Sequence, residues 1–279
     1  MGCFYPRDAW KSKRLNENGK RELVFSRASG FADMRLQVPC GKCDGCYADR
    51  SLTWAIRCYQ EASLFRDNAF LTLTYDEDHY PKDGRISKKA LQDFFKRLRH
   101  EYSVRYFACG EYGDQSGRAH YHALIFGEDF RQGKTVQIND QLYSNFALQE
   151  IWGNGNVLCA EFTMETACYV AGYVGKKIGD SESFSLMSRK PGIGKVWLEK
   201  YWDDISRTGI VVIEGKEYPV PVRYLQWMEK ELEHVKLQRA EKVKEKERRV
   251  GYFEVLREQK AKESYHKQRL QERAIKKKV

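Results

Sequence analysis

Two histidines two residues apart, in GRAHYHALIFG at residues 117–127, are the first side chains of this 279-residue chain that could act together in chemistry. Side chains alternate between the faces of a β-strand, so His120 and His122 point the same way if this apolar run is a strand. Glu111 lies in the preceding strand-like run, VRYFACGEYG, and the connecting DQSG is typical of a hairpin turn. One hairpin register therefore sets a carboxylate beside two imidazoles, which is a ligand set for a divalent metal.

This ligand set does not name a reaction. A zinc hydrolase would use the same three side chains equally well. The plainer interpretation is two histidines on a half-exposed strand with no metal between them.

Two tyrosines one helical turn apart, in YVAGYVGKK at residues 169–177, could supply a nucleophile. On a helix, Tyr169, Tyr173 and Lys176 lie on one side. A separate apolar stripe that can dock on a sheet is formed by Ala167, Val170, Val174 and Ile178. A phenol has a pKa of about 10, so it attacks phosphorus only where positive charge favours its anion. The plainer interpretation is two tyrosines that pack on an interfacial helix.

The motifs FLTLTY, HYH and YVAGYVGK occur in the order of the three motifs of the HUH endonuclease superfamily. With its two tyrosines, the chain resembles the replication initiator proteins of small single-stranded DNA phages, the microviruses. PCGKCDGC and GEYGDQSGRAHYHALIFG are similar to the gokushovirus branch in particular. The resemblance implies a ferredoxin-like or RRM-like antiparallel sheet with flanking helices.

The same resemblance implies a role for each candidate side chain. The metal ligands would be Glu111, His120 and His122. The nucleophiles would be Tyr169 and Tyr173, and the helix lysine that follows them would be Lys176. Some relatives carry a lysine between the tyrosines, where this chain has Gly172, so Lys176 and Lys177 are left as the local cations. The resemblance implies Mg²⁺ or Mn²⁺, while the nitrogen ligands alone favour Mn²⁺ or heavier metals.

The implied activity is that of a rolling-circle replication initiator, a metal-dependent DNA endonuclease and strand transferase. Tyrosine attack on single-stranded origin DNA leaves a 5′-phosphotyrosyl link and a 3′-OH that a host polymerase extends, assisted by a host helicase. A second transfer then closes the displaced strand. Two alternatives remain from the residues alone: a zinc-stabilised nucleic-acid-binding protein without catalysis, and a zinc phosphodiesterase that uses water.

Cysteines at positions 40, 43 and 46 form a C-x-x-C-x-x-C pattern that can bind a structural Zn²⁺ but lacks one ligand. The fourth ligand would be Cys3 or Cys58. Free thiols are one alternative, and an iron–sulfur centre is another, although Arg50 stands where a ferredoxin-type pattern would continue with cysteine.

The formal net charge is +10, which indicates a polyanionic partner such as DNA. Residues 228–279 hold 17 Lys and Arg against 10 Glu, so this tail carries +7 of that charge. Arg118 and Lys177 are further candidate phosphate contacts. No run of about 18 apolar residues spans a membrane and no signal peptide opens the chain, so we expect a protein of the cytoplasm, that of a bacterial host if a phage encodes it.

We therefore expect an α+β fold in which an antiparallel sheet presents the histidines and a helix carries the tyrosines. Residues 1–66 would be an N-terminal cysteine-containing segment, irregular up to residue 39, followed by a helix packed on the core. Residues 67–227 would form the endonuclease core, with a helix capped by Ser87 and a strand pair in IVVIEGKEYPVPV. Residues 228–279 would be a basic helical tail.

Overall fold

The computed structural model describes residues 2–113, 117–176 and 184–276. These residues divide into two compact units, one made of residues 1–49 with 241–279 and the other of residues 50–240. The candidate metal ligands and tyrosines of the hairpin and helix all belong to the second, larger unit. The division into three domains that the sequence suggested stays a prediction.

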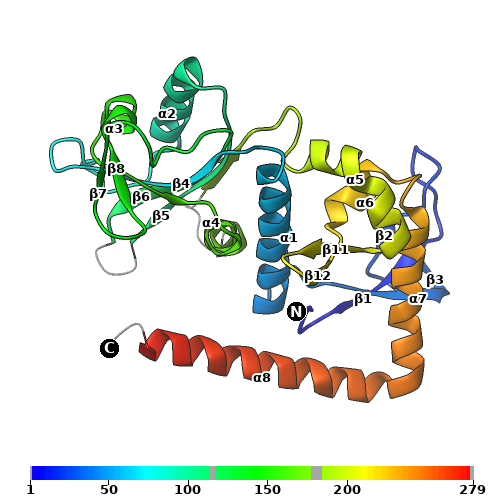
Figure 1. The fold of residues 1–279 in the computed structure, drawn as a ribbon. Coiled ribbons are helices and arrows are strands. Elements are labelled where there is room, and N and C mark those ends of the chain that lie inside the picture. Colours follow the sequence, from blue (N-terminus) through cyan, green and yellow to red (C-terminus); the bar gives the residue numbers. More distant parts are fainter. Residues whose placement is uncertain (1, 114–116, 177–183, 277–279) are drawn as a thin grey trace. The chain divides into compact units, whose positions relative to one another are not determined.

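Seven strands of the larger unit, counted among the described residues, pair into one antiparallel sheet (Figure 1). They are β4 (Asn68–Thr74), β5 (Arg105–Tyr112), β6 (Ala119–Phe126), β7 (Thr135–Gln137), β8 (Tyr143–Asn145), β9 (Val157–Glu161) and β10 (Phe184–Met187). Their order across the sheet is β10-β5-β6-β4-β9-β8-β7, so β10 forms one edge. The predicted α+β class is confirmed.

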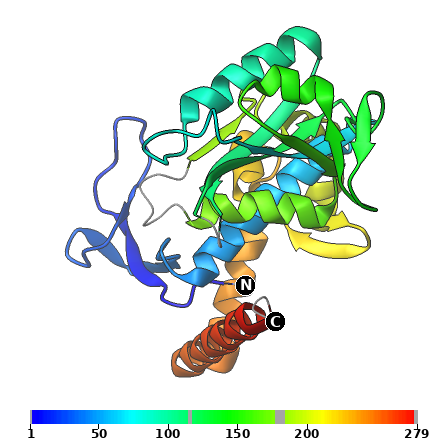
Figure 2. The same cartoon turned by 90° about the vertical axis from the view of Figure 1, so that its left-hand side faces the viewer.

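Two helices complete a β-α-β-β-α-β unit of the ferredoxin-like kind: α2 (Lys88–Glu101) follows β4, and α3 (Phe146–Trp152) follows β6 and the short strands after it. Both helices cover one face of the sheet, and α4 (Met164–Lys176) lies across the other (Figures 1 and 2). The β5–β6 hairpin lies between β10 and β4 in the sheet. One of its faces packs against α2 and the other against α4.

The face under α2 is an apolar core. Helix α2 begins after Ser87, whose side chain accepts a hydrogen bond from the backbone N–H of Ala90 as the N-cap prediction requires. The buried stripe of α2 consists of Leu91, Phe94, Phe95 and Leu98. Alternate residues of the central strands, such as Leu71 and Tyr121, point into this core and are fully buried. Strand alternation therefore leaves the histidines on the other face.

That other face is apolar at one end and polar at the other. Phe107 and Leu124 pack in a cluster with Val170 of α4 and with Ala55 of α1 (Asp44–Ala62). The polar end of the same strands carries the histidines. Helix α4 thus docks on the sheet through its apolar stripe and reaches the polar end with its tyrosine side.

A third cluster lies outside the sheet. It joins α5 (Lys195–Thr208), the hairpin β11 (Ile210–Ile213) and β12 (Lys216–Pro219), α6 (Val222–Trp227) and the start of α7 (Glu233–Val250). The predicted strand pair in this region is confirmed. Helix α7 extends past its buried residues as a charged helix and ends at Val250. Gly251, with a φ of 77°, separates it from α8 (Tyr252–Lys276).

The smaller unit corrects one expectation. Residues up to 39 are not irregular but form an antiparallel sheet of β1 (Arg7–Ser12), β2 (Leu23–Val24) and β3 (Gly30–Val38). These strands have no apolar alternation. Their cross-strand contacts include the ion pair of Arg35 with Asp8 at 2.9 Å and the stacking of Arg7 on Phe25. A scan for hydrophobic periodicity does not detect such pairs.

Among the described residues, none of the helices combines the length and the apolar character that a bilayer crossing requires.

Candidate nicking site and cysteine cluster

The β5–β6 hairpin pairs in the register that sets Glu111 directly opposite His120, with Cys109 opposite His122. On the other side of β6, Thr72 of β4 is the cross-strand partner of His122. The carboxylate and the two imidazoles share a face of the sheet, and all three of their ligand atoms lie within 4.8 Å of one another. Glu111 and His122 are almost fully buried, and His120 is only partly exposed.

Both imidazoles point their Nε2 atoms at the same carboxylate oxygen. The distances from Glu111 Oε1 to His120 Nε2 and to His122 Nε2 are both 2.9 Å. The Nδ1 of His120 lies 3.1 Å from the carbonyl oxygen of Arg118. A carbonyl can only accept, so this Nδ1 carries the proton and the Nε2 of a neutral His120 presents a lone pair to Glu111.

Two side chains that the sequence did not single out position His122. The hydroxyl of Thr72 lies 3.0 Å from its Nδ1, and Phe70 stacks on its ring at 5.5 Å with an interplanar angle of 12°. An outer partner of this kind fixes the tautomer and orientation of a metal-binding imidazole. The sequence FLTLTY could have indicated such an outer partner, because Thr72 and Thr74 are polar residues on one face of an otherwise apolar strand.

Helix α4 brings both tyrosines to this cluster. Its first turn is capped by Thr163, whose hydroxyl accepts a hydrogen bond from the backbone N–H of Thr166. The phenol oxygen of Tyr169 lies 3.4 Å from both Glu111 Oε1 and His122 Nε2. Tyr173 stacks on His122 at 6.1 Å, edge-on to the ring of Tyr169. Residues separated by about 50 positions in the chain thus meet at one point.

The protonation states at this point follow from burial and hydrogen bonds. Burial lowers the pKa of His122 and so favours its neutral form. Burial acts to raise the pKa of Glu111, but without a metal its carboxylate is stabilised by hydrogen bonds from the two Nε2 atoms when these carry protons, and the pKa is lowered. Burial raises the pKa of both Tyr169 and Tyr173. The site therefore holds an ionised carboxylate beside protonated phenols.

The donor set fits a divalent cation. The oxygen of Glu111 and the Nε2 lone pair of His120 are both acceptors, so a proton or a cation must lie between them. Two imidazoles and one carboxylate leave coordination positions open for substrate oxygens. The structure thus brings together every predicted metal ligand and both predicted nucleophiles, while their roles remain predictions.

The remaining predicted residues are the helix lysine and the two candidate DNA contacts. Arg118 forms an ion pair with Glu77 at 2.6 Å and stacks on Tyr80, so its side chain is already engaged, although its carbonyl supports His120. Lys176 is the last residue of α4, but its side chain is outside the described atoms. Lys177 lies outside the described residues.

The cysteine pattern of the smaller unit closes into a group of four. Cys3 joins Cys40, Cys43 and Cys46, and their Sγ atoms lie within 4.8 Å of one another. The Sγ of Cys43 is 3.6 Å from that of Cys46 and 3.9 Å from that of Cys3. Zinc–sulfur bonds of about 2.3 Å place the sulfurs of a tetrahedral site about 3.8 Å apart, so this geometry fits Zn²⁺.

Hydrogen bonding also suits a metal at these sulfurs. Backbone N–H groups of Phe4 and Lys42 point at the Sγ atoms of Cys43 and Cys40, at 3.3 and 3.4 Å. Burial opposes ionisation of the Cys40 thiol, but backbone N–H groups lower its pKa to about 6. Burial raises the pKa of Cys46 to about 12, so the four thiols do not ionise together without a cation.

Cys58 is not the fourth ligand. It is fully buried in the apolar cluster beneath α4, where burial raises the pKa of its thiol. Of the two predicted candidates, Cys3 and not Cys58 lies in the group of four, while zinc binding by this group stays a prediction. Sequence spacing alone could not make this choice because Cys3 is 37 residues from Cys40 and approaches it only through the β1–β3 sheet.

Comparison with known proteins identifies a family and several relatives. The family described as replication-associated protein ORF2/G2P matches residues 68–178. Over 235 residues the chain is 32% identical to the replication-associated protein VP4 of Bdellovibrio phage phiMH2K, covering 76% of this chain and 74% of that protein. It is also 32% identical to the replication-associated protein ORF2 of Spiroplasma virus 4, covering 70% of this chain and 68% of the relative.

A further relative is the replication-associated protein ORF4 of Chlamydia phage 1, which is 32% identical over 66% of this chain. The match spans about half, 51%, of that relative's length. No solved structure matches the chain.

Proposed function

The chain belongs to the family of phage replication-associated proteins, and from this premise we propose that it initiates rolling-circle replication by nicking single-stranded origin DNA with Tyr169. The observation that carries the proposal is the 3.4 Å approach of the Tyr169 oxygen to both Glu111 and His122. This approach places a potential nucleophile beside the side chains that would hold the metal.

Glu111, His120 and His122 would hold a Mg²⁺ or Mn²⁺ ion through one oxygen and two nitrogens, of which the nitrogens favour Mn²⁺. When bound, such an ion supplies positive charge that polarises a phosphodiester and favours a phenolate. The carbonyl of Arg118 and the hydroxyl of Thr72 keep both Nε2 lone pairs directed at the ion. Burial keeps Tyr169 protonated, and hence unreactive, until that charge is present.

Attack by the Tyr169 oxygen on phosphorus forms the tyrosyl–phosphate bond and breaks the bond from phosphorus to the 3′ oxygen. The phenol loses its proton in the attack, the leaving 3′ oxygen gains one and becomes a hydroxyl, and the 5′ phosphate stays on the protein. The new bond conserves the free energy of the one that was broken, so a second transfer can rejoin the strand. A host polymerase in the bacterial cytoplasm would extend the 3′-OH, with a host helicase opening the duplex.

The two tyrosines take different parts in this proposal. Tyr169 is the one within 3.4 Å of the ligand atoms, so it makes the first cut. Tyr173 follows one helical turn later, stacked on His122, and a hydrogen bond that it donates to Tyr169 lowers the pKa of Tyr169 against the effect of burial. Tyr173 is then placed to make the second cut while Tyr169 holds the first end.

The cysteine group would hold a structural Zn²⁺ through Cys3, Cys40, Cys43 and Cys46. Zinc ties the N-terminal residues to the segment that leads into α1, which stabilises a small three-stranded sheet with few buried apolar side chains. Four thiolates leave no open position for substrate, so this site is structural.

A covalent-adduct assay tests the proposal. The protein is incubated with Mn²⁺ and oligonucleotides that tile the DNA carrying its gene, and a protein–DNA band that survives denaturation is expected for one of them. Tyr169→Phe should abolish the band, whereas the control Tyr102→Phe, on the other face of the sheet, should keep it. Cleavage without an adduct would show a hydrolase that uses water, and binding without cleavage by any oligonucleotide would show a non-catalytic module.

A further inference from the structure

A basic cavity lies at the β10 edge of the sheet, and the reaction proposed above does not use it. Its volume is about 710 Å³. Its lining combines the segment after β10 with two tryptophans and several cations: Trp54, Arg57, Met187, Ser188, Arg189, Lys190, Pro191, Gly192, Ile193, Lys195, Arg223 and Trp227. All of these residues belong to the larger unit.

The charge of this lining has one sign. Five of its side chains are cations, namely Arg57, Arg189, Lys190, Lys195 and Arg223, and its lining includes no Asp or Glu. Arg189 and Lys190 also line a neighbouring cavity of about 670 Å³ together with Lys88, Arg99 and Arg105. The two cavities therefore form one basic rim around the end of β10, which suits a ligand with successive negative charges.

The tryptophans and a buried arginine are interleaved in this cavity. The guanidinium of Arg57 lies 4.0 Å from the ring centre of Trp54 and 5.1 Å from that of Trp227. Arg223 lies 5.3 Å from the Trp227 ring. Alternating aromatic and cationic side chains are what a single strand requires, since bases stack on rings while phosphates meet the cations.

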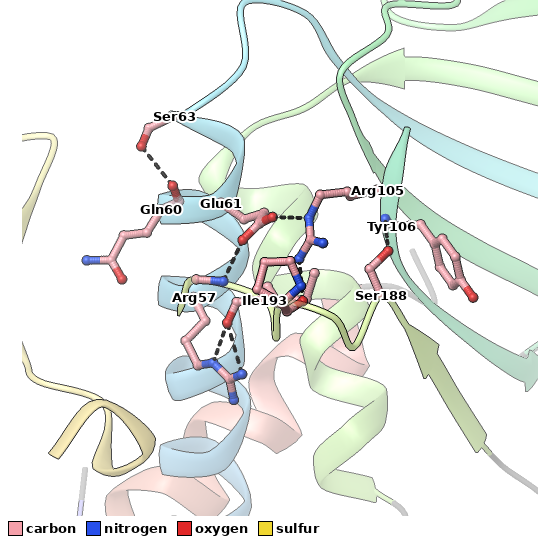
Figure 3. Close-up of polar contacts among 10 residues, drawn as sticks. Arg57, Gln60, Glu61, Ser63, Arg105, Tyr106, Ser188 and Ile193 are labelled. Carbon is pink, nitrogen blue, oxygen red and sulfur yellow. Dashed lines mark hydrogen bonds and ion pairs between the residues drawn. The ribbon is translucent and has the colours of Figure 1, made fainter. Parts of the chain in front are cut away.

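The segment between β10 and α5 is held in place rather than left loose. Both Nε and Nη2 of Arg57 donate to the carbonyl of Ile193, and Glu61 accepts from the backbone N–H of Gly194 at 2.6 Å (Figure 3). Glu61 also pairs with Arg105, which in turn donates to the carbonyl of Pro191 at 2.8 Å. The cavity wall is thus built before any ligand arrives, which lowers the entropic cost of binding.

The cavity and the nicking site lie along one strand. Trp54 packs on Phe107 at 5.0 Å, and Phe107 shares with Glu111 the face of β5 that α4 covers. Phe107 and Glu111 are four positions apart, which is about 13 Å along the strand at about 3.3 Å per residue.

We propose that this tryptophan–arginine cavity binds the single-stranded DNA that flanks the cleaved phosphate, taking phosphates on Arg189, Lys190 and Arg223 and a base against Trp227. The inference rests on the proposed function, since it names where the same substrate continues past the nicking site. It assigns to the larger unit a DNA contact that the basic tail does not supply.

The test separates binding from cutting. The full chain carrying Tyr169→Phe and Tyr173→Phe is kept without added Mg²⁺ or Mn²⁺, and its affinity for a fluorescent (dT)20 is measured by anisotropy from 50 to 200 mM salt. In this background Arg189→Ala, Lys190→Ala and Arg223→Ala are combined. The control combines Lys200→Ala, Lys216→Ala and Lys230→Ala, which removes the same charge from exposed positions outside the cavity.

The cavity variant should bind at least 10-fold more weakly at 100 mM salt, and the slope of log affinity against log salt should fall by about 2, or about 0.7 per lost phosphate contact. The control variant should stay within threefold of its parent. Trp227→Leu should weaken (dT)20 at least fivefold and leave an abasic strand of equal length unaffected. Because the three cations are exposed, the charge variant tests the proposal even if Trp227→Leu fails to fold.

Equal losses in the cavity and control variants would overturn the proposal. So would equal affinity for duplex DNA, or for poly-glutamate with the same dependence on the three cations, since the cavity would then bind polyanions in general. These measurements need neither a nucleophile nor an added catalytic cation. A protein that binds DNA in this cavity but forms no adduct would therefore refute the nickase proposal and leave the cavity proposal in place.

Discussion

Thr72→Val tests whether the site is organised around a metal ion. Valine keeps the shape of threonine and suits a strand, but it removes the hydroxyl that lies 3.0 Å from Nδ1 of His122. His122 is 5% exposed, so water does not readily replace the lost partner. With Nδ1–H left buried and unsatisfied, the ligating tautomer is no longer favoured.

The magnitude follows from the cost of a buried donor without a partner, about 1–3 kcal/mol. At about 1.4 kcal/mol per factor of ten, Mn²⁺ affinity should fall by about 5- to 150-fold. Loss of an outer partner of a metal-binding histidine typically costs 10- to 100-fold, which falls within this range. Adduct formation at limiting Mn²⁺ should fall in proportion and recover at saturating Mn²⁺.

Thr74→Val is the matched control. Thr74 lies two residues along the same strand, faces the same side and is the cross-strand partner of His120, but its hydroxyl donates to the carbonyl of Asn156 at 3.4 Å. Mn²⁺ affinity is measured by titration calorimetry and folding by thermal melts. Equal Mn²⁺ affinities in the two variants, or a Thr72→Val defect that saturating Mn²⁺ does not relieve, would refute the reasoning.

Three further outcomes are expected. Cys3→Ser should lower bound zinc, measured by elemental analysis, from one ion per chain to well below one, whereas zinc in Cys58→Ser should be unchanged; equal zinc in both would contradict the four-cysteine site. Tyr173→Phe should still form the Tyr169 adduct but should fail to rejoin strands, and loss of the adduct would contradict the proposed order. Burial acts to raise the pKa of Asp129, but hydrogen bonds from Arg131 outweigh burial and hold the pKa below its usual 3.8. The ionised carboxylate therefore stabilises the fold above that pH. Asp129→Asn should therefore melt at a lower temperature than wild type at pH 7, and the gap should close as the pH falls through the folded pKa; a gap independent of pH would refute this.

The elements that carry the site could be predicted because each has a strong local signal. Strand alternation put His120 and His122 on one face, and a helical stripe separated Tyr169 and Tyr173 from the apolar side of α4. The cap at Ser87 and the buried stripe of α2 were equally readable. The β1–β3 sheet was missed because its strands are held by cross-strand charged and aromatic pairs.

Sequence by itself determined which side chains could act: a carboxylate, two imidazoles, two phenols and a run of cysteines, each at a spacing that its own strand, helix or loop makes meaningful. Only the tertiary structure decided that β4 supplies Thr72 to His122, that Cys3 and not Cys58 completes the cysteine group, and that α4 crosses the sheet where Tyr169 meets Glu111. Periodicity is a property of neighbouring residues and is therefore written locally in the chain. Contacts between distant segments depend on how buried faces pack together, and no single segment records that.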